Sequence, residues 1–166
     1  MRRGRPRNDF APRHHHVLNA PHSDIVTTPR RSRAREIAIQ ALYRLDMNPG
    51  AVAGDVDRFI AARLGHPGLI GFARGLVAGV HDRRVELDAA LDGRAEHWRV
   101  GRMPATDRAI LRMATFEVLH GDVPGPVAVD EAIELAKRYG TADSARFVAG
   151  VLGRLLADRG ATTPTD

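Results

Sequence analysis

The chain has 166 residues, which is the size of one domain, and it contains no cysteine. Disulfides, thiolate nucleophiles and cysteine-based zinc sites are therefore excluded. Hydrophobic residues make up 43% of the sequence and aromatic residues only 5%, so a core is built mainly from Ala, Leu, Val and Ile. The formal net charge is +5, yet residues 1–35 hold nine arginines against two aspartates, while the remainder is close to neutral. This asymmetry suits an anionic partner that binds at one end of the molecule.

Residues 1–29 mix Arg, Pro, His, Asn and Thr with few apolar side chains, and we interpret them as a disordered basic arm. His14, His15 and His16 have no carboxylate beside them at ligand spacing, so a solvated tract is a better interpretation than a metal site. The arm lacks the apolar core of a signal peptide, and no run of about 18 apolar residues occurs in the chain. We therefore expect a cytoplasmic protein without a membrane span.

The pattern after the arm predicts helices. The first runs from Ser32 to about Met47 and ends at a strong breaker, Asn48-Pro49-Gly50. Its apolar stripe at helical spacing consists of Ile37, Ala38, Ala41, Leu42 and Leu45. A second, weaker segment spans residues 55–64. A third begins near Leu69, and its pattern continues toward Trp98 as either one long helix or two.

Helices are also predicted after Met103-Pro104, over residues 106–119, about 127–139 and from about 143 onward. Residues 159–166 are expected to form a flexible tail. No segment alternates apolar and polar residues as a strand would, so the sequence predicts an all-α fold of six or seven helices. We expect one helical unit over residues 30–158, with a seam between two small bundles near residues 99–105.

Four arginines at the start of the first helix are the strongest functional signal: Arg30, Arg31, Arg33 and Arg35. A packed helix would hold their guanidinium groups in a fixed patch that suits phosphate, which favours a nucleic-acid contact. An arginine preference throughout the chain, where Lys137 is the only lysine, is the competing explanation. The sequence has no Gly-rich phosphate loop, no His-Glu-x-x-His and no Gly-x-Ser-x-Gly, so we expect neither an enzyme nor a cofactor.

Two aromatic residues have alternative interpretations. Phe147 begins the apolar stripe of the last predicted helix, which favours a core position, but a place one turn into that helix also allows stacking on an unpaired RNA base. Trp98 follows an amphipathic segment, and we expect it to pack in the core.

Three blocks of sequence together resemble the NusB family of bacterial transcription antitermination factors. They are RSRAREIAIQALY at residues 31–43, Trp98 followed by DRAILRMATFEV at 107–118, and residues 123–152 with EAIELAKRYG and FVAGVL. The resemblance implies two roughly perpendicular three-helix bundles and no catalysis. It implies binding to the boxA element of ribosomal RNA transcripts together with the ribosomal protein NusE, inside an antitermination complex on RNA polymerase. Members of the family occur as monomers and as homodimers.

The resemblance also assigns site residues. For RNA binding it indicates the helix start and the beginning of the last helix, namely Arg30, Arg31, Arg33, Arg35, Asp143, Ser144, Arg146 and Phe147. For the protein partner it indicates Tyr43 and Asp107. The chain departs from the family pattern where Ser32 separates the arginines and where Ala149 replaces an asparagine.

Two other functions remain open from the sequence. One is a protein-interaction module in which RNA has a minor role. The other is a helical domain detached from a ribosomal RNA cytosine methyltransferase, because similar domains precede the catalytic domain of some of those enzymes.

Overall fold

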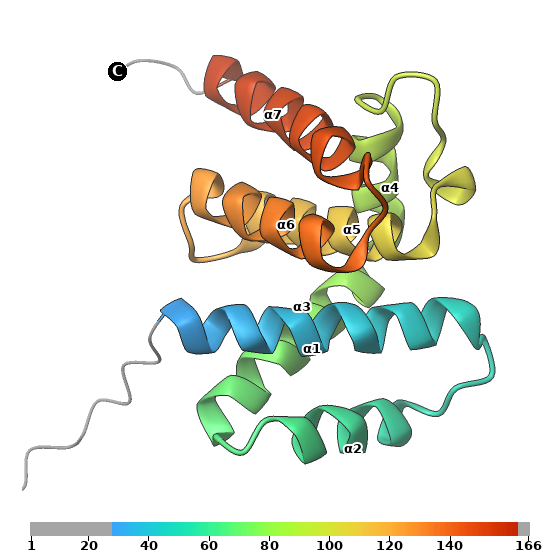
Figure 1. Ribbon diagram of the computed structural model, residues 1–166, viewed down its shortest axis with the longest axis vertical. Coiled ribbons are helices and arrows are strands. Elements are labelled where there is room, and N and C mark those ends of the chain that lie inside the picture. Colours follow the sequence, from blue (N-terminus) through green and yellow to red (C-terminus); the bar gives the residue numbers. More distant parts are fainter. Residues whose placement is uncertain (1–27, 163–166) are drawn as a thin grey trace, which may run out of the picture.

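The structure is a computed structural model that describes residues 28–162, and within this range it is all-α, as predicted. Figure 1 shows its elements, a 3₁₀ helix η1 among seven α-helices. Their bounds are α1 (Thr28–Met47), α2 (Ala53–Arg63), α3 (Pro67–Asp82), α4 (Arg84–Asp92), η1 (Val100–Arg102), α5 (Ala105–His120), α6 (Gly125–Tyr139) and α7 (Ser144–Thr162). None of these helices is long and apolar enough to cross a membrane.

Two boundaries differ from the sequence-based expectations, and one alternative that was left open is decided. Helix α1 begins at Thr28, so the last two residues assigned to the basic arm are helical; the rest of the arm lies outside the described residues. The long third segment is two helices, α3 and α4, which are interrupted at Arg83. Helix α7 continues to Thr162, into the stretch that was expected to be a flexible tail.

Helix α5 is the centre of the molecule. It packs on α1 and α3 on one side and on α4, α6 and α7 on the other, so that α1–α3 form one group of helices and α4–α7 a second (Figure 1). The boundary between the two groups therefore lies between α3 and α4, earlier than the predicted seam near residues 99–105. Most of α5 is buried, including Ile110, Leu111, Met113 and Ala114. Without cysteine and with few aromatic residues, this aliphatic packing supplies the core.

Helices α3 and α5 approach closely at Gly79. A Cβ atom added to Gly79 would lie 2.1 Å from the ring of Phe116 on α5, so any larger residue there would have to displace that ring. The close crossing positions α1–α3 directly against the central helix.

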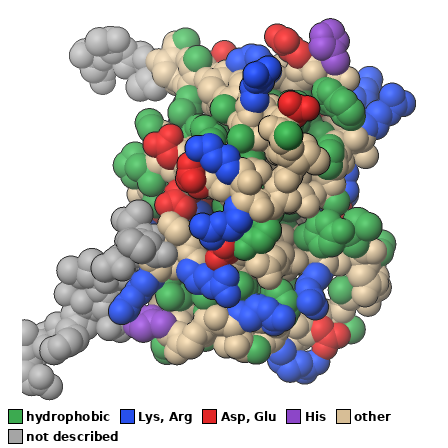
Figure 2. Space-filling view, viewed as in Figure 1, with side chains coloured by type: hydrophobic (Ala, Val, Ile, Leu, Met, Phe, Trp, Pro, Cys, Tyr) green, Lys and Arg blue, Asp and Glu red, His purple; other side chains and the backbone are tan. Residues whose placement is uncertain are grey.

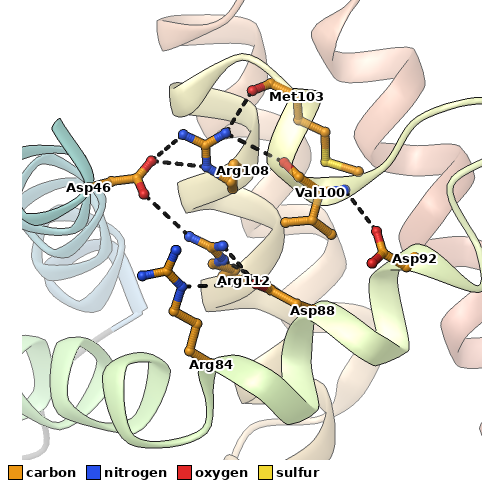
Figure 3. A network of polar contacts seen from close by, with 8 residues as sticks. All are labelled: Asp46, Arg84, Asp88, Asp92, Val100, Met103, Arg108 and Arg112. Atoms are coloured by element: carbon orange, nitrogen blue, oxygen red, sulfur yellow. Dashed lines mark hydrogen bonds and ion pairs between the residues drawn. The ribbon is translucent and has the colours of Figure 1, made fainter.

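A network of charged side chains joins the end of α1 to α4 and α5 (Figure 3). Arg112 of α5 donates two hydrogen bonds to Asp88 of α4, at 2.7 and 2.8 Å, and lies 3.6 Å from Asp46 of α1. Arg108 donates to Asp46 at 2.9 Å and to the carbonyl oxygen of Met103 at 3.0 Å. The network thus fixes the irregular connection before α5 as well as the two groups of helices.

Replacing Asp46 by Ala is expected to lower the free energy of unfolding by about 2–4 kcal/mol, because it leaves two nearly buried guanidinium groups short of a counter-charge. The matched control is Asp57→Ala, which removes an exposed partner of Arg74 and should cost less than about 1 kcal/mol. Urea unfolding of the two variants measures both values. Equal losses would contradict the role assigned to the network.

Candidate nucleic-acid interface

Arg35 is an internal residue and not part of an exposed patch, which corrects the prediction that it contacts RNA. Its side chain is 1% exposed and forms a two-pronged pair with Glu117 of α5, with Nε 3.0 Å from Oε2 and Nη2 2.7 Å from Oε1. A guanidinium group that is used in this way has no free edge for a phosphate. The sequence did indicate this position. Arg35 lies seven residues, or two helical turns, before Leu42, which is buried, so the two side chains share one face of α1.

The other three arginines at the start of α1 differ in how far their charges are available to a ligand. Arg30 is exposed. Arg31 is half-buried: its guanidinium lies 4.9 Å from the ring centroid of Phe72 on α3 and 3.8 Å from Asp122. Arg33 is exposed and donates to Glu36 at 2.6 Å. Arg30 and Arg33 therefore offer charge to a ligand, whereas Arg31 is partly engaged with α3.

Glu36 connects α1 to the end of α6, and sequence reasoning missed it. Its side chain is 7% exposed and accepts hydrogen bonds from Arg33, from Arg138 and, at 2.6 Å, from the hydroxyl of Tyr139. Burial raises the pKa of Glu36, but the hydrogen bonds from Tyr139, Arg33 and Arg138 outweigh it and lower the pKa to about 2. Burial and the bond to Glu36 raise the pKa of Tyr139. Since α7 begins a few residues after Tyr139, this cluster ties the start of α1 to the α6–α7 corner.

A cavity of ≈ 350 Å³ lies at the beginning of α7. Its lining includes Phe147 of α7, Thr141 and Asp143 of the turn before α7, Asp107 of α5, and Trp98 and Pro104 of the connection before α5. Phe147 packs partly on the core, as one interpretation expected, and partly lines the cavity, so stacking on a base stays a prediction. Asp143 and Arg146 are exposed at the rim of the helix.

Asp107 is the most unusual residue of this cavity. It is 4% exposed, and its Oδ1 is a buried oxygen without a hydrogen-bond partner in the described structure. The resemblance indicates Asp107 for the protein partner; the structure places it in the wall of this cavity with very little exposed surface. A buried carboxylate oxygen without a donor is costly, by about 1–3 kcal/mol or more, so the cavity is suited to a ligand that supplies N–H or O–H groups.

Ser144 was expected to contact RNA, but it is a buried residue. It is 1% exposed, and its Oγ accepts a hydrogen bond from the Thr141 amide at 2.8 Å, which closes the turn before α7. The hydroxyl therefore shapes the cavity wall from inside and is already occupied.

Trp98 is half-exposed instead of packed in the core as expected. Its exposed fraction is 50%, and it follows His97, whose φ of 65° is the only positive value of a non-glycine residue in the described range. A left-handed residue of this kind is costly and turns the chain sharply, and here it brings an indole ring to the cavity. Nothing in the helical pattern of the sequence indicates that turn.

A second cavity, of ≈ 480 Å³, lies beside the first and shares the start of α5 with it. It is lined by Tyr43, Gln40 and Arg44 of α1, Tyr139 of α6 and Thr106 of α5, together with Ile39 and Ala109. Tyr43 is 41% exposed, in agreement with a surface position. Figure 2 shows that basic side chains follow α1 across one face of the molecule, and that they extend toward α2. No group of three potential metal ligands occurs among residues 28–162.

Comparisons with known proteins agree on one family. A sequence model of the NusB family matches residues 32–157. The transcription antitermination protein NusB of Symbiobacterium thermophilum is 46% identical over 140 residues, which cover 76% of this chain and 88% of the relative. NusB of Anaeromyxobacter dehalogenans is 42% identical over 131 residues, which cover 78% of this chain and 92% of the relative.

Solved structures share the arrangement of the helices. NusB from T. maritima matches with a TM-score of 0.70 and 32% sequence identity, over 80% of this chain and 93% of that chain. A structure of antitermination factors NusB and NusE in complex with dsRNA matches with a TM-score of 0.70 at 21% identity, over 80% of this chain and 99% of that chain. At this lower identity the likeness concerns the fold alone.

Arg35→Gln is expected to lower the free energy of unfolding by about 3–5 kcal/mol, because it leaves Glu117 buried without its counter-charge. Arg33→Gln, at an exposed position, should change it by less than about 1 kcal/mol. Denaturant melts measure both. If the two variants are equally stable, the division between structural and exposed arginines is wrong.

Glu36→Gln is expected to remove a pH-dependent part of the stability, about 2–3 kcal/mol at pH 7. Because the folded-state pKa is lowered to about 2 from 4.5, the carboxylate stabilises the wild-type protein above pH 4.5, and this contribution is lost as the pH falls toward 2. Unfolding curves between pH 7 and pH 2.5 should therefore converge for wild type and variant at the acid end. The exposed Glu134→Gln serves as control. A difference in the free energy of unfolding between wild type and Glu36→Gln that stays constant with pH would contradict the role assigned to Glu36.

Proposed function

Because the chain belongs to the NusB family, we propose that it is a non-catalytic, RNA-binding factor of transcription antitermination. It binds boxA-type RNA of ribosomal RNA transcripts, and it does so together with the ribosomal protein NusE in an antitermination complex on RNA polymerase. It acts in the cytoplasm.

The observation that carries the RNA part of this proposal is Asp107, whose Oδ1 has no hydrogen-bond partner, in the wall of a cavity that two aromatic side chains also line. We call this cavity the base cavity. An unpaired base presents amino and imino N–H groups along its edge, and a carboxylate oxygen accepts them. The rings of Trp98 and Phe147 offer flat apolar surfaces for the face of the same base. A single base thus satisfies the carboxylate and covers the exposed indole.

Basic side chains near the cavity would supply attraction that is independent of sequence. Arg33, Arg138 and Arg146 are exposed, and the first two are held in place through Glu36. Guanidinium groups bind phosphate oxygens, whereas contacts to the base edge select the sequence. This separation supports a site in which the cavity reads a base and the surrounding arginines hold the strand.

The neighbouring cavity supports the protein partner. Tyr43 and Tyr139 are both partly exposed there, at 41% and 36%, above the buried Ile39. Exposed tyrosines with a buried apolar floor are typical of protein interfaces, where the ring packs and the hydroxyl stays hydrated. Because this cavity shares the start of α5 with the base cavity, NusE and RNA would bind side by side.

The test is Trp98→Ala, assayed on boxA RNA and on a scrambled RNA, with and without NusE. Loss of one stacking ring should weaken boxA binding by about 1–3 kcal/mol. Because Trp98 is half-exposed, the melting temperature should hardly change. Phe147→Ala should lower both affinity and stability, because that ring also packs on the core.

The control is Val85→Ala, which removes an apolar side chain that is 86% exposed on α4 and should leave binding unchanged. Unaltered boxA affinity of the Trp98 variant would contradict the base cavity. Binding of NusE without any measurable RNA affinity would contradict the RNA-binding function and favour a protein-interaction module.

A further inference from the structure

Two arginines from different helices lie on one aromatic ring. Arg44 is in the last turn of α1 and Arg63 in the last turn of α2. Their guanidinium carbons are 4.1 and 3.7 Å from the ring centroid of Phe59, so they are no farther apart than the sum of these distances. Contact with the ring face holds each group in place, and Arg63 also donates to the Phe59 carbonyl at 3.3 Å.

Neither guanidinium has a counter-charge. Among residues 28–162, no carboxylate oxygen lies within ion-pair distance of Arg44 or Arg63. The contrast with nearby arginines is clear, since Arg58 pairs with Asp55 on α2 itself and Arg74 pairs with Asp57. A cation at the carboxyl end of a helix is favourable, but this effect does not explain why both guanidinium groups contact the same ring. Like charges held this close repel, and anionic groups bound to them offset this cost.

The pair lies at the cavity that was assigned to the protein partner, which shares the start of α5 with the base cavity. Arg44 lines the ≈ 480 Å³ cavity together with Thr106, the residue before Asp107, whose carboxylate lies in the base cavity. Along this face the basic side chains follow α1 and extend toward α2 (Figure 2). A strand that has a base at Asp107 and passes along the edge of the partner cavity would therefore meet Arg44 near the end of α1.

We propose that Arg44 and Arg63 form a clamp for the phosphodiester backbone of single-stranded RNA that runs beyond the bases held at the start of α7. This inference rests on the proposed function. Guanidinium groups match phosphate oxygens through paired N–H donors, so two groups held against one ring can bind neighbouring phosphates of the same strand. The clamp is independent of sequence, so it adds affinity and fixes the direction in which the strand leaves.

The experiment compares three RNAs: the shortest boxA fragment that the wild-type protein binds specifically, and the same fragment extended by uridines at its 5′ or its 3′ end. One extension should bind wild type about 3- to 10-fold more tightly at low salt, with a salt slope steeper by about 1.4, since each single-strand phosphate contributes about 0.7. The double variant Arg44→Gln/Arg63→Gln should lose this gain and keep the affinity for the short RNA.

The matched control is Arg58→Gln/Arg74→Gln, which removes the same charge from the same group of helices but from arginines that are already paired. It should keep the gain from the extension. The proposal is overturned if the control loses the gain equally, if the Arg44/Arg63 variant retains it, or if that variant loses only NusE binding. Wild type that binds the short RNA without any gain overturns the clamp alone, whereas wild type that binds no RNA overturns the proposed function as well.

Discussion

The contact on which the structure depends is the buried pair between Arg35 and Glu117. It joins α1 to the central helix α5 across 82 residues of sequence, and both side chains are almost fully excluded from solvent. An internal charge is tolerated only with a well-placed partner, so the pair admits one rotation and one axial position of α1. Glu131 of α6 lies 3.8 Å from the same guanidinium, and the ring of Phe72 on α3 packs against it. One arginine therefore sets α1 relative to three other helices.

That constraint positions the exposed groups. With Arg35 turned inward, Glu36 on the neighbouring side of α1 meets Arg138 and Tyr139 at the end of α6, and Arg33 is drawn to the same carboxylate. The α6–α7 corner and the base cavity follow directly after Tyr139. On its outer side, α1 presents Tyr43 and Arg44 to the second cavity. The first half of α1 thus contacts the corner beside the base cavity, and its later residues line the second cavity.

The helical pattern was readable from the sequence because apolar spacing reports which residues face a core. The all-α fold was predicted in this way, and the end of the first helix at Met47 followed from the Asn-Pro-Gly breaker. The position of Tyr43 came from the resemblance to the family, and the residue is exposed. The pairing of Arg35 was not predicted: its spacing from Leu42 indicates the inner face of α1, but nothing in the sequence identifies a carboxylate 82 residues away. The half-exposure of Trp98 depends on the left-handed turn at His97, which apolar periodicity does not encode. Asp107 likewise became notable only when its oxygen was found buried without a donor.

The central claim is that one RNA base enters the cavity between Trp98 and Phe147, above Asp107. Photo-crosslinking of boxA RNA that carries 4-thiouridine at successive positions, followed by mass spectrometry of the linked peptides, tests it most directly. The account predicts that some positions crosslink to the peptides containing Trp98 or Phe147, and that positions farther along the strand link to the α1 surface. Crosslinks confined to α2, α3 or α4, with none at the start of α7, would contradict it.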